Sequence, residues 1–411
     1  MANDIKVMSA LDKEIIRQFN VKSIVGNTFN RQYDKTYQAF GTKAGSTIQI
    51  KQIQRYVVST GATLVKQDHI ERVINLPRTT QKHVGLAFTS QELTQDLTTV
   101  EGMAMFSQEN LETAMDTLCA DIDNDVLTQA QQATYNSIGT PGTAPSSYSD
   151  ISSAKALLNK NMASRSNRHY VGTEDMIQSL ASGMINLFNP TGQRSQDYRT
   201  GHVNGNVADF DVWSTDFLSS HTNGDATGTP LLNGSTAEGA SSLVTDGWGA
   251  TQTLTKGTRF TIAGVRRVNL VSKQAKKDLQ VFVATADAVS DGSGNMTIPV
   301  APALEAAGAY QNIDALPADN AAITVQGSAS TTYEQGLFYH RDAHVFAVQD
   351  LHKINSNVER YIRDEKLKIS MKLTMDGDIS TYEAISRLDV LYGYAALAPW
   401  WSGIQWGAAQ V

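Results

Sequence analysis

The chain has 411 residues, which at about 150 residues per domain predicts roughly two to three domains. Charged residues make up only 18% of it and the formal net charge is −7. This balance argues against a strong, sequence-independent nucleic-acid-binding protein, because such binding depends on many lysines and arginines. The single cysteine, Cys119, excludes a disulfide framework and a cysteine-rich metal site. A surface this poor in charge suggests extensive contact with other molecules.

Nothing in the sequence predicts export or a membrane span. The first residues lack a basic region followed by an apolar one, so no signal peptide is expected. The most apolar stretch, 390–401, is shorter than the roughly 20 residues that cross a bilayer. Residues 7–20 predict a short amphipathic helix, and residues 21–45 a polar arm.

Residues 47–88 predict a long two-stranded excursion. Apolar and polar residues alternate in three runs, 47–50, 71–76 and 83–88, and such alternation is typical of strands. A turn signal, Ser59 to Ala62, lies between the first and the last of them. Because a lone two-stranded ribbon is only marginally stable in water, we expect support from outside the local fold.

The strongest helical pattern covers residues 103–135. Its apolar side chains recur every three or four residues and form one stripe. They are Leu111, Met115, Leu118, Ile122, Val126 and Ala130. Such a helix would be roughly 45–50 Å long, which is more than one small domain needs, and it would end before the linker 139–145.

Residues 149–218 predict a small α/β unit in which helices and strands alternate. The helices are expected at 151–162 and 173–180, the latter with Thr173 as a possible N-cap, and the strands at 168–171 and 208–213.

At about residue 220 the composition shifts to Ser, Thr, Gly and Asn. Short strands are predicted at 259–262, 279–283, 296–300 and 321–325, with a hairpin turn at 291–294. Short strands separated by turn signals favour a small β-barrel inserted in the chain.

The C-terminal part returns to strands. Apolar Leu367, Ile369, Met371 and Leu373 alternate with Lys366, Lys368, Ser370 and Lys372, which predicts a half-buried strand with a basic outer face. Asp376 and Gly377 predict a hairpin turn, and 388–394 the return strand.

The sequence contains few residue patterns that are typical of catalytic or metal-binding sites. His340 and His344 stand four residues apart, but no glutamate follows the first histidine, so the pair is not a zinc-protease motif and a structural role is favoured. The chain lacks a nucleophile elbow, a phosphate-binding loop and a dinucleotide fingerprint. The sequence therefore gives an enzyme no positive support.

Three acids and the cysteine fall inside the helical stripe. Asp121, Asp123 and Asp125 begin like a calcium loop, but Val126 takes the position that needs glycine. We therefore expect these acids to form the solvated face of the helix. Cys119 lies mid-stripe, where a buried structural thiol is favoured over a nucleophile.

One stretch concentrates positive charge. It contains Lys256, Arg259, Arg266, Arg267, Lys273, Lys276 and Lys277. On a small β-barrel these residues could bind a polyanion, but only Phe260 and Phe282 lie nearby for base stacking. A solvated or protein-contacting face is favoured.

The order of elements resembles the tailed-bacteriophage major capsid (coat) proteins that share the Johnson fold, above all short-tailed-phage coat proteins with an insertion domain. The likeness covers nearly the whole chain and rests on loose motifs. They are 86–93, similar to the return of the E-loop; 103–135, similar to the spine helix; 167–171 and 198–201, similar to axial-domain segments; 338–343, similar to the re-entry after the insertion; and 387–393, similar to the closing strand.

The resemblance implies an α+β fold with seven successive parts. They are an N-terminal helix and arm, 1–45; an E-loop β-ribbon, 46–90; a peripheral domain with the spine helix, 91–145; the first part of an axial domain, 146–225; an inserted β-barrel domain, 226–330; the axial return, 331–357; and peripheral strands with the C-terminus, 358–411.

The resemblance also implies a function. The chain would be a structural subunit, not an enzyme, that assembles as hexamers and pentamers into an icosahedral shell around double-stranded DNA, which it encloses without sequence-specific binding. It implies no catalytic residues, cofactor, metal or membrane, and it places the protein in the virion capsid, assembled in the host bacterial cytoplasm. No scaffold-like region precedes the arm, so separate scaffolding and portal proteins are expected. The arm and the ribbon would lie over neighbouring subunits.

Some relatives crosslink neighbouring subunits through a lysine and an asparagine. Lys66 and either Asn355 or Asn357 stand in comparable places, but no specific motif surrounds them, so the role is not assigned. Three alternatives stay open: an encapsulin-like nanocompartment shell that encloses protein cargo, a nucleic-acid-binding β-barrel protein, and an uncharacterised hydrolase.

Overall fold

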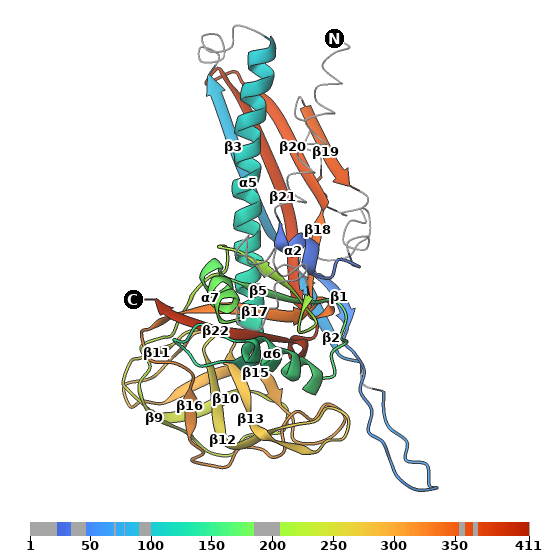
Figure 1. Ribbon diagram of the computed structural model, residues 1–411, viewed down its shortest axis with the longest axis vertical. Coiled ribbons are helices and arrows are strands. Elements are labelled where there is room, and N and C mark those ends of the chain that lie inside the picture. The colour runs from blue at the N-terminus through green and yellow to red at the C-terminus, as the bar shows by residue number, and fades with distance from the viewer. Residues whose placement is uncertain are drawn as a thin grey trace. The chain divides into compact units, whose positions relative to one another are not determined.

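The computed structural model describes residues 23–33, 47–69, 71–77, 79–89, 100–184, 206–352, 358–364 and 369–410. In these ranges the protein is a mixed α+β protein, rich in strands (Figure 1). It divides into two compact units: the first contains 1–50, 73–126 and 344–395, and the second contains 51–72, 127–343 and 396–411. Among the described residues, no helix is both long and apolar enough to cross a membrane.

A five-stranded sheet forms the first unit, in the order β18-β21-β20-β19, with β3 also paired to β21. Its strands are β3 (Thr80–Thr89), β18 (His344–Gln349), β19 (Val358–Asp364), β20 (Ile369–Asp378) and β21 (Glu383–Ala396). β3 pairs with β21 in unbroken register from Thr80 opposite Tyr392 to Thr89 opposite Glu383. The run 83–88 therefore belongs to this sheet, and its assignment to the two-stranded excursion was wrong.

The hairpin between β20 and β21 closes later than Asp376 and Gly377 predict. Both residues still pair across the hairpin, with Ile385 and Ala384, and the turn follows at 379–382. The pairing register of the two strands, rather than the local Asp-Gly sequence, therefore sets the position of the turn.

The predicted basic outer face of β20 is also wrong at Lys372. This side chain is buried, with a relative exposure of 5%, and its Nζ lies 3.3 Å from the Glu359 carboxylate of β19. Because the carboxylate neutralises the ammonium, the lysine can be buried in the sheet.

Helix α5 (Val100–Ala133) confirms the predicted long helix. At 1.5 Å per residue it is about 50 Å long. Leu118, Ile122, Val126 and Ala130 of the predicted stripe are buried, whereas the side chains of Leu111 and Met115 lie outside the described part of the chain.

A short N-terminal segment, residues 23–33, packs within the first unit. It contains helix α2 (Ile24–Thr28), and the side chains of Val25 and Phe29 are fully buried. Asn30 forms a β-bridge with Val345 of β18. The expectation that the arm lies over neighbouring subunits is thus wrong for this segment. The predicted helix 7–20 and the rest of the arm lie outside the described residues.

The second unit contains a seven-stranded sheet flanked by two helices. The sheet has the order β4-β22-β17-β5-β7-β6, with β8 also paired to β17. Its strands are β4 (Ser137–Ile138), β5 (Arg168–Gly172), β6 (Asn206–Val207), β7 (Phe210–Ser214), β8 (His221–Thr222), β17 (Thr332–His340) and β22 (Ser402–Gln410). The helices are α6 (Tyr148–Lys160) and α7 (Glu174–Met184).

This sheet and its helices confirm most of the predicted α/β unit. The Thr173 hydroxyl accepts a hydrogen bond from the Met176 N–H at 3.3 Å, as expected of an N-cap. The predicted strand 208–213 is shorter, because Ala208 and Asp209 have positive φ angles of 51° and 67° and form the turn between β6 and β7. Left-handed backbone at two successive residues cannot continue a strand.

A six-stranded sheet follows in the same unit, in the order β16-β12-β13-β15-β10-β9. Its strands are β9 (Gly228–Leu232), β10 (Ala240–Trp248), β12 (Arg259–Val268), β13 (Ala275–Ala284), β15 (Met296–Leu304) and β16 (Ile323–Val325). We call it the inserted sheet. Phe260 and Phe282 stack in its core with ring centroids 6.1 Å apart. Strands β9 and β10, and the short pair β11 (Thr253–Leu254) and β14 (Ala288–Val289), were not predicted.

Candidate functional site

An exposed loop of the second unit is the candidate site, and we call it the ribbon, residues 52–72. It extends from β1 (Thr47–Lys51) and β2 (Val73–Pro77), which pair with each other (Figure 1). Its large apolar side chains are exposed by 40% to 84%. They are Ile53, Tyr56, Val57, Val58, Leu64 and Val65. Apolar surface gathered on one exposed segment is typical of a protein–protein contact.

Side chains, rather than a backbone ladder, join the two sides of the ribbon. The Gln67 side chain accepts a hydrogen bond from the Val57 N–H at 2.9 Å and donates one to the Val57 carbonyl. The Tyr56 hydroxyl lies 3.1 Å from Nδ1 of His69. The chain reverses at Gly61, whose φ of 117° suits only glycine. The predicted two-stranded structure is therefore confined to the base, β1 with β2.

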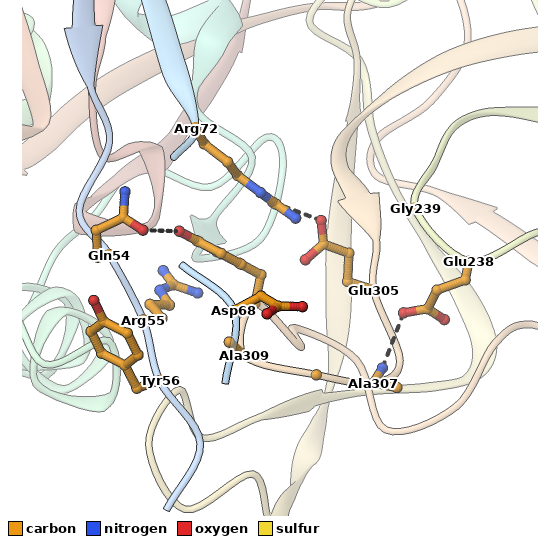
Figure 2. A pocket seen from close by; sticks show the side chains of 12 residues that line it. Gln54, Arg55, Tyr56, Asp68, Arg72, Glu238, Gly239, Glu305, Ala307 and Ala309 are labelled. Atoms are coloured by element: carbon orange, nitrogen blue, oxygen red, sulfur yellow. Dashed lines mark hydrogen bonds and ion pairs between the residues drawn. The ribbon is translucent and has the colours of Figure 1, made fainter. Parts of the chain in front are cut away.

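The base of the ribbon lies against a loop of the inserted sheet (Figure 2), and side chains of both line a cavity of about 270 Å³. The Arg72 guanidinium lies 2.7 Å from Oε1 of Glu305 and 3.8 Å from the ring centroid of Tyr310. The Tyr310 hydroxyl donates a hydrogen bond to Oε1 of Gln54 at 3.2 Å. An ion pair, a cation–π contact and a hydrogen bond thus meet on one loop.

A second arginine of the base stacks on aromatic rings. The Arg55 guanidinium lies 4.5 Å from the ring centroid of Trp400 and 5.8 Å from that of Tyr310. Burial lowers the pKa of Arg55, and the Glu305 carboxylate opposes that effect. Arginine is still protonated at neutral pH, so the stacking is a cation–π contact.

The two histidines of the sequence analysis stand at strand ends: His340 is the last residue of β17 and His344 is the first residue of β18. They are joined by a 3₁₀ turn, Arg341–Ala343, rather than by a helix. His340 accepts a hydrogen bond at Nδ1 from the Asp342 N–H at 3.2 Å. The ring of His344 stacks on Phe29, and burial lowers its pKa to about 3. His344 thus packs inside the first unit, and no group of three metal-binding side chains occurs in the described residues.

The three acids of α5 are not a solvated face. Asp123 is only 1% exposed, and its carboxylate accepts hydrogen bonds from the Ser23 hydroxyl at 2.8 Å and the Ile24 N–H at 2.7 Å. Asp125 accepts one from the Tyr392 hydroxyl, and Asp121 is the exposed member of the three. Residues two apart point to different sides of a helix, so these acids cannot share one face.

The buried state of Asp123 changes its titration. Burial raises the pKa of this carboxyl to about 6, against the effect of its hydrogen bonds to Ile24 and Ser23. Cys119, in the same helix, is buried as predicted.

The predicted basic concentration does not form one surface. Arg259 is fully buried and donates hydrogen bonds to the carbonyls of Gln131 at 2.5 Å and Thr134 at 2.8 Å, at the end of α5. Burial lowers its pKa to about 9. Arg267 binds the Asn161 side chain. The exposed members are Lys256, Arg266, Lys276 and Lys277. The sequence did not reveal that an inserted strand caps the helix.

The residues of the possible crosslink are only partly described. Lys66 is exposed on the ribbon, whereas Asn355 and Asn357 lie outside the described residues.

Comparison with known proteins gives one family match and several similar structures. The model of the P22 coat protein family (gene protein 5) matches residues 90–407. A structure from Mycobacterium phage Che8 is 12% identical and covers 93% of this chain and 91% of its own, with a TM-score of 0.48. The capsid of Ralstonia phage GP4 is 9% identical, with 95% and 92% covered and a TM-score of 0.45.

The CUS-3 coat protein I-domain is 25% identical and covers 24% of this chain and 96% of its own, with a TM-score of 0.19. No curated protein sequence matches the chain.

Proposed function

Since this chain belongs to the P22 coat protein family and is a structural shell subunit of a tailed phage, we propose that it assembles as hexamers and pentamers into an icosahedral shell around double-stranded DNA. The family match carries the assignment. The ribbon supports the mode of assembly, because its apolar side chains need a surface to cover them. Other copies of the chain are the partners that a closed shell supplies.

The parts of the fold take their roles from this proposal. Helix α5 is the spine helix, the ribbon is the E-loop and residues 226–330 are an inserted β-barrel. The barrel is supported by contacts between the edge strands of the inserted sheet: Leu231 forms a bridge with Ala322, and the Leu232 N–H donates to the Ala321 carbonyl at 3.0 Å. The seven-part division, from 1–45 to 358–411, belongs to the same proposal, except that residues 80–89 are removed from the E-loop because they form β3 of the first unit's sheet.

The partners and setting follow from the same role. A separate scaffolding protein directs assembly in the host bacterial cytoplasm, and a portal protein occupies one vertex. The shell encloses DNA without sequence-specific contacts. The dispersal of the basic residues fits this role better than a polyanion-binding barrel, because Arg259 and Arg267 are engaged within the chain.

Electron microscopy and sedimentation of the purified chain, alone and with the scaffolding protein of the same phage, test the proposal. Capsomers or closed particles are expected. A strictly monomeric chain under both conditions contradicts the proposed assembly. Particles that copurify with an enzyme cargo instead of DNA would favour a nanocompartment.

A further inference from the structure

The loop that touches the base of the ribbon is fixed in the inserted sheet. It follows β15 and covers residues 305–312. The hydrogen bonds that hold it include Asn312 N–H to the Glu305 carbonyl at 2.9 Å, Asn312 Nδ2 to the Ala303 carbonyl at 2.6 Å, Lys273 Nζ to the Ala309 carbonyl at 2.7 Å, and Ala307 N–H to Oε1 of Glu238 at 3.1 Å. The loop is therefore a fixed surface, and its side chains can hold a second segment in place.

The ribbon needs such a support. Pairing of β1 with β2 ends where the Gln52 N–H donates to the Arg72 carbonyl at 2.8 Å, and no strand occurs among the described residues of 52–72. A two-stranded segment held at one end twists and bends easily. The contact with loop 305–312 lies just beyond the last backbone hydrogen bond between the two sides of the ribbon. It therefore holds the ribbon at a second point, and two points of attachment define the direction in which the ribbon extends.

The contact between the ribbon base and loop 305–312 combines a partly buried ion pair with a tyrosine that reaches both sides of the ribbon. Figure 2 shows the ion pair between Arg72 and Glu305. The side chain of Glu305 is only 12% exposed and that of Arg72 is 41% exposed, so the ion pair is partly shielded from water and its charges interact more strongly than at an open surface. The Tyr310 ring lies against the Arg72 guanidinium, and its hydroxyl reaches the opposite side of the ribbon at Gln54. One loop thus holds both sides of the ribbon.

We propose that Glu305 and Tyr310 are positioning residues of the inserted sheet, which fix the direction of the ribbon and thereby the curvature of the shell. The effect on the shell rests on the proposed function, whereas the effect on the ribbon does not. The inserted sheet thus acts on assembly by setting the angle at which the ribbon of the same chain meets the next subunit.

Charge exchange between the two partners tests the proposal. The variants are Glu305→Arg, Arg72→Glu and both together. Spin labels at Ala62→Cys on the ribbon and at Ser293→Cys, in the turn before β15, report the direction of the ribbon in the isolated subunit; both sites are exposed, and the native Cys119 is buried. We expect a narrow label-to-label distance distribution in the parent chain, a several-fold broader one in each single variant, and a narrow one again in the double variant.

Electron microscopy of assembled particles supplies the second measurement. Particles of mixed diameter or open sheets are expected from the single variants, and uniform particles from the double variant. The matched control exchanges Lys51 with Glu71, an ion pair of the ribbon base at 2.7 Å whose two residues do not line the cavity between the ribbon and the loop, and it should leave both measurements unchanged.

Tyr310→Phe removes only the hydroxyl that reaches Gln54, so it provides a milder variant if charge reversal prevents folding; a moderately broader distribution is expected. An unchanged distance distribution in Glu305→Arg, or in Tyr310→Phe if the former does not fold, overturns the proposal. If the parent chain forms no particles at all, the proposed shell function fails, while the spin-label result still decides whether the loop positions the ribbon.

Discussion

Residues 23–33 and the ribbon are both short segments outside the large sheets, yet only the first is buried within its own unit. In the N-terminal segment Val25 and Phe29 are fully buried. In the ribbon, Val58 is 84% exposed and Leu64 is 79% exposed. The two segments contain similar apolar residues, so the amount of apolar surface does not explain the difference.

The difference lies in how each segment satisfies its backbone and groups its side chains. Val25 and Phe29 stand four apart on one short helical turn and point to the same side, and the Asp123 carboxylate accepts the Ile24 N–H of that turn. In the ribbon, apolar residues follow one another at 56–58, so they point to both sides of an extended chain. These side chains stay exposed in the isolated chain, and in the proposed shell a neighbouring subunit covers them.

The largest effect is expected from removing the ring that anchors the N-terminal segment. Phe29 packs on His344, with centroids 5.3 Å apart, and on Tyr394. We expect Phe29→Ala to lower the free energy of unfolding by about 3–5 kcal/mol, measured by urea denaturation of the isolated subunit. Tyr56→Ala in the ribbon is the control and should cost less than about 0.5 kcal/mol. Equal losses of unfolding free energy in the two variants would show that the N-terminal segment and the ribbon contribute equally to the stability of the subunit.

A smaller, pH-dependent effect is expected at Asp123. Its pKa is raised to about 6 from an ordinary value of 3.8, so between these values the folded chain holds a proton that the unfolded chain has released. The stabilisation is complete below about pH 4 and is lost as the pH rises through about 6. It amounts to roughly 2–3 kcal/mol at about 1.4 kcal/mol per pKa unit. Asp123→Asn should abolish this part of the pH dependence.

Urea denaturation midpoints at about pH 4.5, 5.5 and 7 measure this slope. Asp121→Asn is the matched control on the same helix, since Asp121 is exposed and paired with Lys82 at 2.6 Å; it should keep the slope. A slope that survives Asp123→Asn would show that the N-terminal segment is anchored without this carboxyl.

Regular periodicity made much of the fold predictable from the sequence. The stripe of Leu118, Ile122, Val126 and Ala130 identified α5, and alternation identified parts of β3, β20 and β21. Strand β10 was missed because its register shifts between Asp246 and Trp248, which breaks the two-residue period. A search for two-residue alternation therefore misses a strand that contains a bulge.

The contacts that give the site its shape could not be predicted in this way. The end of α5 is capped by Arg259, which lies 125 residues from Thr134 in the chain, so no capping rule based on neighbouring residues finds it. The pairing of Arg72 with Glu305 likewise joins residues far apart in the sequence. Charge signs show that such pairs are possible, and only the fold selects which of them form.

The smallest effect on stability, and the sharpest test of the difference between the two segments, is expected at the tip of the ribbon. Val58 has few contacts to lose, so Val58→Ser should change the free energy of unfolding by less than about 0.5 kcal/mol. It should nevertheless reduce the yield of particles in an assembly assay followed by light scattering, because in the proposed shell this side chain is buried between subunits. Val289→Ser is the matched control, since Val289 is an exposed valine of β14, at 58%.

If both variants assemble like the parent chain, the exposed surface of the ribbon does not drive assembly. If Val58→Ser instead unfolds the subunit, the tip of the ribbon is packed against its own chain, as the N-terminal segment is.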